Sequence, residues 1–378
     1  SYIFMNYNKT VIHPNLLAYK RIRIVLGNES CDLDSAVSAL IQAFSEYLDG
    51  IEKKETDLAV IPLMNIPERE YHVKTEVVFF LKRHNIPSNL LIFRDQIDLK
   101  AFKKDMGTKL ELVLVDHHNL PDEDIYLIDY VVKIIDHRPQ DERWSWPGRE
   151  IHLESVGSCA TLVARNLFDK HAEIIDSQIS SLLRGPILVD TCNFSKEADR
   201  ATAVDVEMVE ALEKVGLLDL DRDKLFNEIV KAKSDISELT IDDLLIKDLK
   251  VVVGIPIVGL PMLVKDFLDL QEARLESLGN FAKCKNTTIV VLMGLKLNAQ
   301  KISRDIAVFS SSANRLRDKI IEALMVSTQP SLELSLIKKI HQEDGDVNLF
   351  LYEQKNLRAT RKQILPIIRD TVSLECRC

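Results

Sequence analysis

The chain has 378 residues, is 46% hydrophobic and carries a formal net charge of -9 at pH 7. This length and composition predict a globular protein with a large buried core and two or three domains. The acidic balance argues against a binding face for duplex nucleic acid, although a local basic cleft could hold phosphate. The apolar runs are far shorter than a membrane span of about 20 residues.

Cysteine usage and the N-terminal region bear on location. The six cysteines include no Cys-x-x-Cys pair, and the first residues lack the continuous apolar core of a signal peptide. We therefore expect reduced cysteines and a cytoplasmic protein that does not associate with membranes.

The first half of the chain alternates short apolar runs with segments of helical periodicity. Strands are predicted at 21–26, 58–64, 90–93, 110–115 and 131–135, and helices at 36–47 and 75–84. The last of these runs is rich in β-branched residues, as a strand buried on both faces would be. The alternation is typical of an α/β fold with a doubly wound parallel sheet.

A second, smaller α/β domain is predicted after residue 223. A helix at 203–215 is followed by turn-forming and charged residues at 216–223, which we interpret as a linker. Beyond it we expect helices at 224–232, 261–278 and 313–323, and strands at 249–257 and 288–293. The predicted domains are therefore 1–215 and 224–378.

Four apolar runs end in polar groups that contain aspartate. These are the 28–35 segment with Asp32 and Asp34, Asp116-His117-His118, Asp136-His137-Arg138 and Asp190-Thr191. The carboxyl ends of parallel strands share one edge of a sheet, where ligands bind. Each group alone is explained by capping or turn formation, but four of them in one predicted domain indicate a divalent-metal site.

The spacing of the first group suits metal binding. In Asp32-Leu33-Asp34 both carboxylates can point toward one cavity while Leu33 points into the core. Ser35 would cap the following helix and bring its positive end near the site. Carboxylate oxygens suit Mg²⁺ or Mn²⁺, and imidazole shifts the preference toward Mn²⁺.

The ordered motifs NxxxDxDS, LVDHH, IIDHRP and LVDTCNF resemble the DHH phosphoesterase superfamily, and closely its prune-type exopolyphosphatase branch. The resemblance continues through 25–35, 65–67, 91–99 and 156–161. It implies an N-terminal DHH domain joined to a C-terminal DHHA2-type domain, with the active site in the cleft between them.

The resemblance also implies roles for individual residues. The implied metal ligands are Asp32, Asp34, Asp116 and Asp190, with Asp136 as a further candidate, and the implied catalytic residues are His117, His118, His137 and Arg138. His117 or His137 would donate a proton to the leaving oxygen, and His118 would either bind substrate or replace a lost ligand.

Two positions depart from the family pattern. Arg138 stands where the DHH signature ends in histidine, and Asn28 stands where the first motif usually has histidine. Both departures remove imidazole, so Mg²⁺ should be tolerated better. The planar fork of Arg138 can bind phosphate bidentately, and we place Asn28 with it among the substrate-binding residues.

The second domain contributes basic residues to the prediction. The 359–366 segment, ATRKQILP, resembles the SRKKQ-type phosphate-binding segment of related pyrophosphatases, which implies substrate roles for Arg361 and Lys362. Lys250 resembles another lysine of that domain that faces the cleft. The alternative for each is a solvated basic side chain.

The predicted function is metal-dependent hydrolysis of short-chain inorganic polyphosphate, such as tripolyphosphate and tetrapolyphosphate, with release of orthophosphate. Two Mn²⁺ or Mg²⁺ ions roughly 4 Å apart would activate the attacking water. One alternative is a phosphodiesterase of the same superfamily acting on cyclic nucleotides or oligonucleotides, which the aromatic content of only 6% disfavours because a base needs a stacking surface. The other is mainly a regulator that binds protein partners in signalling and has a weakly active site.

Overall fold

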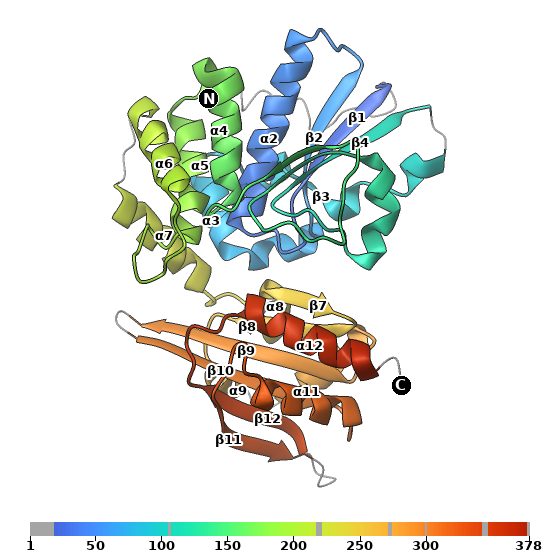
Figure 1. Ribbon diagram of the computed structural model, residues 1–378, viewed down its shortest axis with the longest axis vertical. Coiled ribbons are helices and arrows are strands. Elements are labelled where there is room, and N and C mark those ends of the chain that lie inside the picture. The colour runs from blue at the N-terminus through green and yellow to red at the C-terminus, as the bar shows by residue number, and fades with distance from the viewer. Residues whose placement is uncertain are drawn as a thin grey trace. The chain divides into compact units, whose positions relative to one another are not determined.

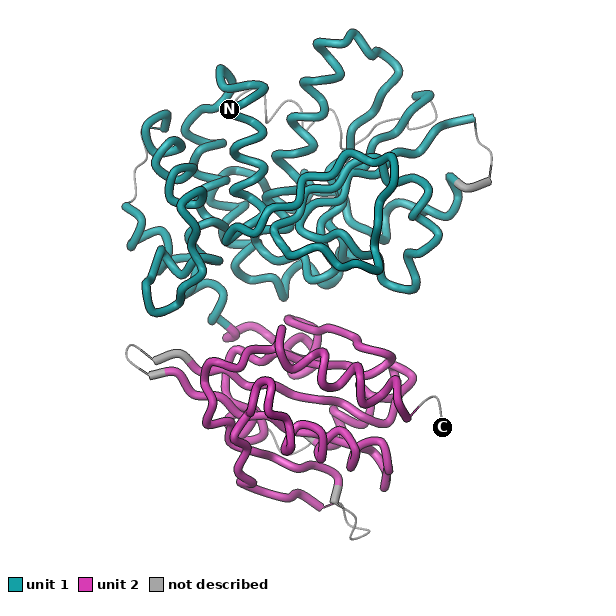
Figure 2. The backbone as a smooth tube through the Cα atoms, in the orientation of Figure 1, with its two compact units in different colours: residues 1–235 teal, residues 236–378 magenta. Residues whose placement is uncertain are grey.

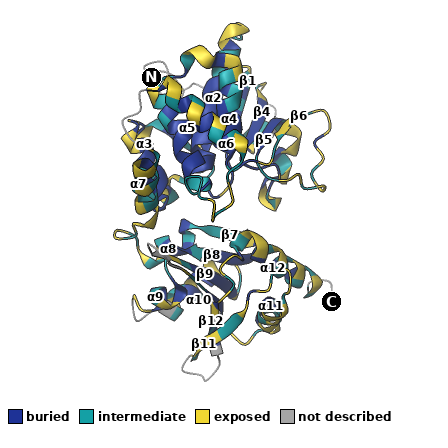
Figure 3. Ribbon diagram, turned by 60° about the vertical axis from the view of Figure 1, so that its left-hand side comes forward, coloured by how far each residue is buried: buried dark blue, intermediate teal, exposed yellow. Residues whose placement is uncertain are grey.

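The computed structural model describes residues 19–104, 107–216, 221–270, 274–298, 301–341 and 347–375. The chain divides into two compact units, residues 1–235 and 236–378 (Figure 2). Each unit has its own buried core between sheet and helices (Figure 3). Within the described ranges, no helix has the length and apolar character needed to cross a membrane.

The first unit is built on a six-stranded parallel sheet with the order β3-β2-β1-β4-β5-β6 (Figure 1). Its strands are β1 (Arg21–Leu26), β2 (Leu58–Met64), β3 (Ile92–Phe93), β4 (Lys109–Val115), β5 (Val131–Asp136) and β6 (Glu150–Leu153). The doubly wound parallel sheet is thus confirmed. The strand order reverses between β1 and β4, and open α/β sheets bind ligands at such a switch point.

Six α-helices belong to the first unit. They are α2 (Leu33–Glu52), α3 (Thr75–Arg83), α4 (Cys159–His171), α5 (Ser177–Asp190), α6 (Ala203–Val215) and α7 (Arg222–Ser234) among the described residues. Helices α2, α4 and α5 pack together over one face of the sheet. The connecting segments contain the 3₁₀ helices η2 (Glu68–Val73), η3 (Ser88–Leu90), η4 (Arg94–Gln96), η5 (Ala101–Lys104), η6 (Asp122–Tyr130) and η7 (Ala172–Ile174).

The division between the units lies further along the chain than the predicted linker. Helix α7 packs against α3 and α5, because its Leu225 and Ile229 are buried in the first core. The 224–232 segment, expected in the second domain, therefore belongs to the first unit. Of the predicted linker, residues 217–220 lie outside the described residues.

The second unit is also α/β, with the sheet order β11-β12-β10-β9-β8-β7. Its strands are β7 (Leu249–Val252), β8 (Ile255–Leu260), β9 (Ile289–Asn298), β10 (Lys301–Ser310), β11 (Leu334–His341) and β12 (Val347–Gln354). Its helices are α8 (Ile241–Lys247), α9 (Val264–Leu268), α10 (Arg274–Cys284), α11 (Arg315–Val326) and α12 (Arg361–Glu375). One core lies between the sheet and α8, α9 and α10, and the other between the sheet and α11 and α12.

Two predicted elements of this unit differ from the structure. The strand expected at 249–257 is a hairpin, because Val253 and Gly254 turn the chain with φ of 47° and 77°. The helix expected at 261–278 is two helices, α9 and α10. Helix α9 begins at Val264 rather than Pro261, because the buried Asp305 carboxylate accepts the N–H groups of Val264 and Lys265.

Candidate metal centre

Three side chains from three strand ends converge at the switch point of the first sheet. Asp34 lies in the first turn of α2 after β1, Asp116 follows β4, and His137 follows β5. Each offers a ligand atom, and these three atoms lie within 4.8 Å of one another. The three residues form the ligand cluster. His137 Nε2 lies 3.3 Å from Asp116 Oδ1 and 4.0 Å from Asp34 Oδ2.

Asp116 is the most constrained member of the cluster. Its backbone takes a left-handed φ of 59°, which is uncommon outside glycine, and the residue is only 1% exposed. Oδ2 accepts a hydrogen bond from the Ser35 hydroxyl at 2.7 Å. Oδ1 makes no hydrogen bond of good geometry with the described residues, but it lies 3.1 Å from a guanidinium nitrogen of Arg138 and 3.3 Å from His137 Nε2. Burial favours the neutral carboxyl, but the charges of Arg138 and His137 hold the pKa of Asp116 well below its ordinary value.

Asp34 is oriented by the N-terminus of α4. Its Oδ2 accepts the N–H of Cys159 at 2.7 Å, and its Oδ1 accepts the N–H of Ala160 at 2.8 Å. These two residues begin the helix, where N–H groups lack partners within the helix itself. Burial, together with repulsion from Asp116 and Asp190, raises the pKa of Asp34 well above its ordinary value.

His137 presents a lone pair to the two carboxylates when its ring is neutral. Nδ1 lies 3.0 Å from the carbonyl oxygen of Val156. Because a carbonyl only accepts, Nδ1 carries the proton, and Nε2 is left as the ligand atom. Burial opposes protonation of the ring, but hydrogen bonding to Asp116 and attraction to Asp34 raise the pKa of His137 to about 9.

Asp32 and Asp190 border the ligand cluster. Asp32 caps α2, since its Oδ1 accepts the N–H of Ser35 at 3.1 Å. Asp190 ends α5 rather than a strand, and its buried Oδ2 lacks a hydrogen-bond partner among the described residues. Burial and repulsion from Asp32 raise the pKa of Asp190 to about 6. The two carboxylates thus share one electrostatic environment with the cluster.

These residues fit a divalent cation. Ligand atoms bound at about 2.1 Å in an octahedron lie roughly 3 to 4.2 Å apart, and the two distances from His137 Nε2, 3.3 and 4.0 Å, fall in this range. The buried Oδ2 of Asp190, which makes no hydrogen bond with the described residues, adds a further acceptor. Buried carboxylates that repel one another are stabilised by nearby positive charge, which a bound cation would add to that of Arg138.

Comparisons with known proteins identify the family of the chain. Residues 227–371 match the model of the DHHA2 domain. Over 358 residues the chain is 37% identical to the exopolyphosphatase PRUNE1 of Bos taurus. The match covers 93% of this chain and 76% of that protein. The chain belongs to the prune-type exopolyphosphatase family.

A fission yeast relative and a solved structure extend the likeness. A putative exopolyphosphatase of Schizosaccharomyces pombe is 29% identical, over 92% of this chain and 90% of that protein. The crystal structure of a putative family II inorganic pyrophosphatase from Methanococcus jannaschii superposes with a TM-score of 0.58 at 18% identity, covering 92% of this chain and 99% of that one. This second likeness shows that the prune-type chain has the family II pyrophosphatase fold.

Arg138, the prune-type departure from the DHH signature, lies against the ligand cluster. Its guanidinium donates to the backbone oxygen of Asp116, and lies 3.1 Å from Asp116 Oδ1 and 3.2 Å from Asp136 Oδ1. The side chain is 32% exposed. It is therefore placed where its remaining N–H groups can reach an anion.

His118 and Asp136 hold each other rather than a ligand. His118 Nδ1 donates to Asp136 Oδ2 at 2.5 Å, and His118 Nε2 accepts the N–H of Asp141 at 2.9 Å. Asp136 Oδ1 accepts the N–H of His137 at 2.8 Å. Both ring nitrogens of His118 are thus hydrogen-bonded, so the catalytic role of His118 and Asp136 as a metal ligand stay predictions that require these bonds to change. The pair braces the loop that carries His137.

Asn28 and His117 lie at the cluster in different ways. Asn28 Nδ2 donates to Asp116 Oδ2 and its Oδ1 accepts from Ser30, so the amide is engaged on both sides and does not suit the predicted contact with substrate. His117 Nδ1 donates to the carbonyl oxygen of Val115 at 2.9 Å. Burial lowers the pKa of His117, which keeps its ring neutral and disfavours it as a proton donor.

The basic residues predicted to bind substrate gather at one place in the second unit. Arg361, the first residue of α12, donates to Asp248 through both its terminal nitrogens, at 2.8 and 2.7 Å. Lys362 follows it and is exposed. Lys250 lies in β7, two residues after Asp248, which ends α8 just before the strand. A Cβ at Gly259 would lie 2.5 Å from Asp248 Oδ2 and 3.1 Å from an Arg361 nitrogen, so the pair depends on this glycine.

Our sequence analysis missed the residues that hold the ligands. The 156–160 segment supplies the acceptor for His137 and both N–H donors for Asp34. Asp205 in turn accepts from Gly157 and Thr161. The only sequence signal was the resemblance at 156–161, which assigned no role to these backbone groups.

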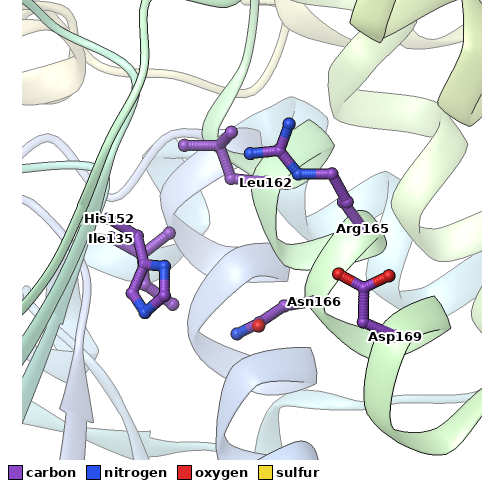
Figure 4. Close-up of a pocket in the computed structure, with 6 residues that line it drawn as sticks. All are labelled: Ile135, His152, Leu162, Arg165, Asn166 and Asp169. Atoms are coloured by element: carbon purple, nitrogen blue, oxygen red, sulfur yellow. The ribbon is translucent and has the colours of Figure 1, made fainter.

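A separate cavity lies between the β5–β6 edge and α4 (Figure 4). Its volume is about 220 Å³, and it is lined by Ile135, His152, Leu162, Arg165, Asn166 and Asp169. Its two basic side chains are already paired, His152 with Glu150 and Arg165 with Glu154. The cavity contains no member of the ligand cluster.

Proposed function

We propose that this protein hydrolyses phosphoanhydride bonds of short-chain inorganic polyphosphate, such as tripolyphosphate and tetrapolyphosphate, and releases orthophosphate. The observation that carries the proposal is the convergence of Asp34, Asp116 and His137, whose ligand atoms lie within 4.8 Å of one another. Family membership supports it, because the named relatives include exopolyphosphatases and a manganese-dependent inorganic pyrophosphatase from Methanothrix thermoacetophila.

The proposed reaction depends on divalent ions, Mn²⁺ or Mg²⁺, with two taking part. Bound ions supply Lewis acidity, which lowers the pKa of a water molecule and neutralises phosphoryl oxygens. Asp34, Asp116, His137 and Asp190 would hold the first, and Asp32 borders the second. Because His137 Nε2 faces two carboxylates, its role in this proposal is that of a ligand rather than the proton donor we predicted.

Substrate binding is assigned to cationic side chains. Arg138 would hold a phosphoryl group at the cluster, where a rigid fork of donors stabilises charge that develops in the transition state. Lys250, Arg361 and Lys362 would bind the anionic chain from the second unit. Phosphoryl transfer relies mainly on positioning and electrostatics, so the proposal needs no proton donor, in agreement with the neutral ring of His117.

The test compares substrates and one conservative substitution. Purified protein would be given tripolyphosphate, pyrophosphate, a long polyphosphate and a cyclic nucleotide in parallel, with Mg²⁺ or Mn²⁺. We expect metal-dependent release of phosphate from tripolyphosphate in preference to the others. Asp116→Asn should abolish it, because it removes the ligand charge and keeps the shape. Asp129→Asn, the same change at an exposed position, should leave it unchanged.

Each other outcome has a meaning. Full activity and unchanged metal affinity in Asp116→Asn would refute the metal assignment. Cleavage of the cyclic nucleotide alone would instead establish the phosphodiesterase alternative. Absence of hydrolysis with all four substrates would leave the protein-binding regulator.

A further inference from the structure

The cavity at the β5–β6 edge of the first sheet has polar groups on two opposite sides. Figure 4 shows His152 of β6 on one side, and Asn166 and Asp169 of α4 on the other. Ile135 and Leu162, which belong to the first core, supply its apolar lining. The cavity therefore suits a ligand that is polar at both ends and apolar in the middle.

The positive charges in and around this cavity are already neutralised by carboxylates. Both terminal nitrogens of Arg165 donate to Glu154, at 3.3 and 2.5 Å. Lys133 Nζ lies 2.9 Å from Glu46 and 3.2 Å from Glu150. An anionic ligand would have to displace one of these carboxylates, so the cavity does not suit an anion.

Two side chains turn hydrogen-bond acceptors toward the cavity. His152 Nε2 lies 2.8 Å from Glu150 Oε1. Because a carboxylate only accepts, Nε2 carries the proton, and Nδ1 of the neutral ring is an acceptor. Gln42 Nε2 donates to the Glu46 carboxylate at 2.8 Å, so Gln42 Oε1 faces Asn166 Nδ2, at 3.5 Å. The amide orientation is thereby fixed, and Asn166 Oδ1 remains available as an acceptor.

Asp169 adds a negative charge that no ion pair neutralises. The residue is exposed, and its carboxylate has no hydrogen-bond or ion-pair partner among the residues that the structure describes. Arg165 attracts it but is bound to Glu154. The atoms that remain available at His152, Asn166 and Asp169 are thus all acceptors, which suits a ligand that donates hydrogen bonds and carries positive charge.

The volume limits the length of such a ligand. At about 30 Å³ for each water-sized group, a cavity of about 220 Å³ holds roughly seven non-hydrogen atoms. We infer that this cavity binds a short aliphatic diamine in its diammonium form. Its methylene groups would cover Ile135 and Leu162. One ammonium would bind Asn166 and Asp169, and the other would bind His152 Nδ1. The inference does not depend on the proposed function.

The test is titration calorimetry of the intact chain with 1,4-diaminobutane, with Mg²⁺ present to compete at the acidic ligand cluster. The unsubstituted protein should bind one equivalent, and 1,4-butanediol, which has the same length without charge, should not bind. Asp169→Asn should lower the affinity about fivefold, as expected for an ion pair near the surface. Asp129→Asn, the same change at an exposed position of η6 on the other face of the sheet, should leave it unchanged.

A second measurement locates the ligand without a substitution that affects binding. In NMR spectra of the histidine rings, the His152 signals, identified by their absence in His152→Gln, should shift saturably as 1,4-diaminobutane is added. No binding by the unsubstituted protein, or equal binding of 1,4-butanediol, would overturn the inference. An unchanged affinity in Asp169→Asn, or His152 signals that stay in place, would refute the assignment of the diamine to this cavity.

Discussion

Asp205→Asn should weaken metal binding although Asp205 is not a member of the ligand cluster. The carboxylate is fully buried in the first turn of α6. It accepts the N–H of Gly157 at 2.9 Å and the hydroxyl of Thr161 at 2.5 Å, and it caps the helix through Thr202. Gly157 and Thr161 flank the backbone groups that orient Asp34 and His137. Loosening this segment would let both ligands move.

The size of the effect follows from the number of bonds involved. Hydrogen bonds to a charged group contribute about 1.5–3 kcal/mol and neutral ones about 0.5–1.5 kcal/mol. Asparagine keeps one acceptor and can donate to Thr161, so the free energy of unfolding should fall by about 1–2 kcal/mol. Loss of the groups that orient ligands typically lowers metal affinity by about 10–100-fold. Because Asp205 acts through one intervening segment, we expect the lower end, about tenfold.

The assay pairs Mn²⁺ titration calorimetry with urea denaturation of the metal-free protein. Asp243→Asn is the matched control, because Thr240 and Asp243 form the same capping box at the start of α8 in the second unit. It should lose stability without losing metal affinity. A folded Asp205→Asn protein with the Mn²⁺ affinity of the unsubstituted chain would refute the argument.

Three further changes test other parts of the structure. Arg138→His should strengthen Mn²⁺ binding about tenfold, because it replaces a charge 3.1 Å from Asp116 with a ligand; no gain in titration calorimetry would place residue 138 outside the coordination shell. Burial lowers the pKa of His84 to about 4, so the stability contributed by the neutral ring is present above its unfolded pKa of about 6.5 and is lost as the pH falls toward 4. Urea denaturation should show a loss of about 2 kcal/mol between pH 7 and pH 5 that is absent in His84→Gln, and equal losses in both proteins would contradict this. Gly259→Ala should raise the KM for tripolyphosphate with little change in kcat, because the added Cβ would separate Arg361 from Asp248. Gly279→Ala is the control and should change neither constant, because its Cβ would meet only a Phe309 ring atom at 4.0 Å.

The parallel sheet could be predicted because its strands are buried on both faces. Such strands are continuous apolar runs, and β1 and β2 have the predicted bounds. The β7–β8 hairpin could not be predicted in the same way. Its turn places Val253 at φ 47°, a conformation that β-branched residues avoid. Because valine is typical of strands, the sequence across the turn reads as one continuous strand.

The site could be predicted as a set of residues but not as a set of bonds. Asp34, Asp116 and His137 do converge, because strand order brings their motifs to one edge. Sequence motifs do not show which atoms are already engaged, so the hydrogen bond between His118 and Asp136 could not be foreseen, and the roles predicted for these two residues stay predictions. The sequence analysis predicted only a helix at 203–215, because the hydrogen bond from Gly157 to Asp205 joins residues 48 apart in the chain.

The division of the chain into two units with separate cores separates two kinds of chemistry. The acidic ligand cluster lies wholly within residues 1–235, and the basic residues at β7 and α12 lie wholly within residues 236–378. Covalent linkage converts the meeting of two such groups into an intramolecular event, with effective concentrations on the order of millimolar for short flexible links. In the proposed function, each basic side chain would bind phosphate weakly on its own, so that the shortened product of each cleavage is released rather than retained.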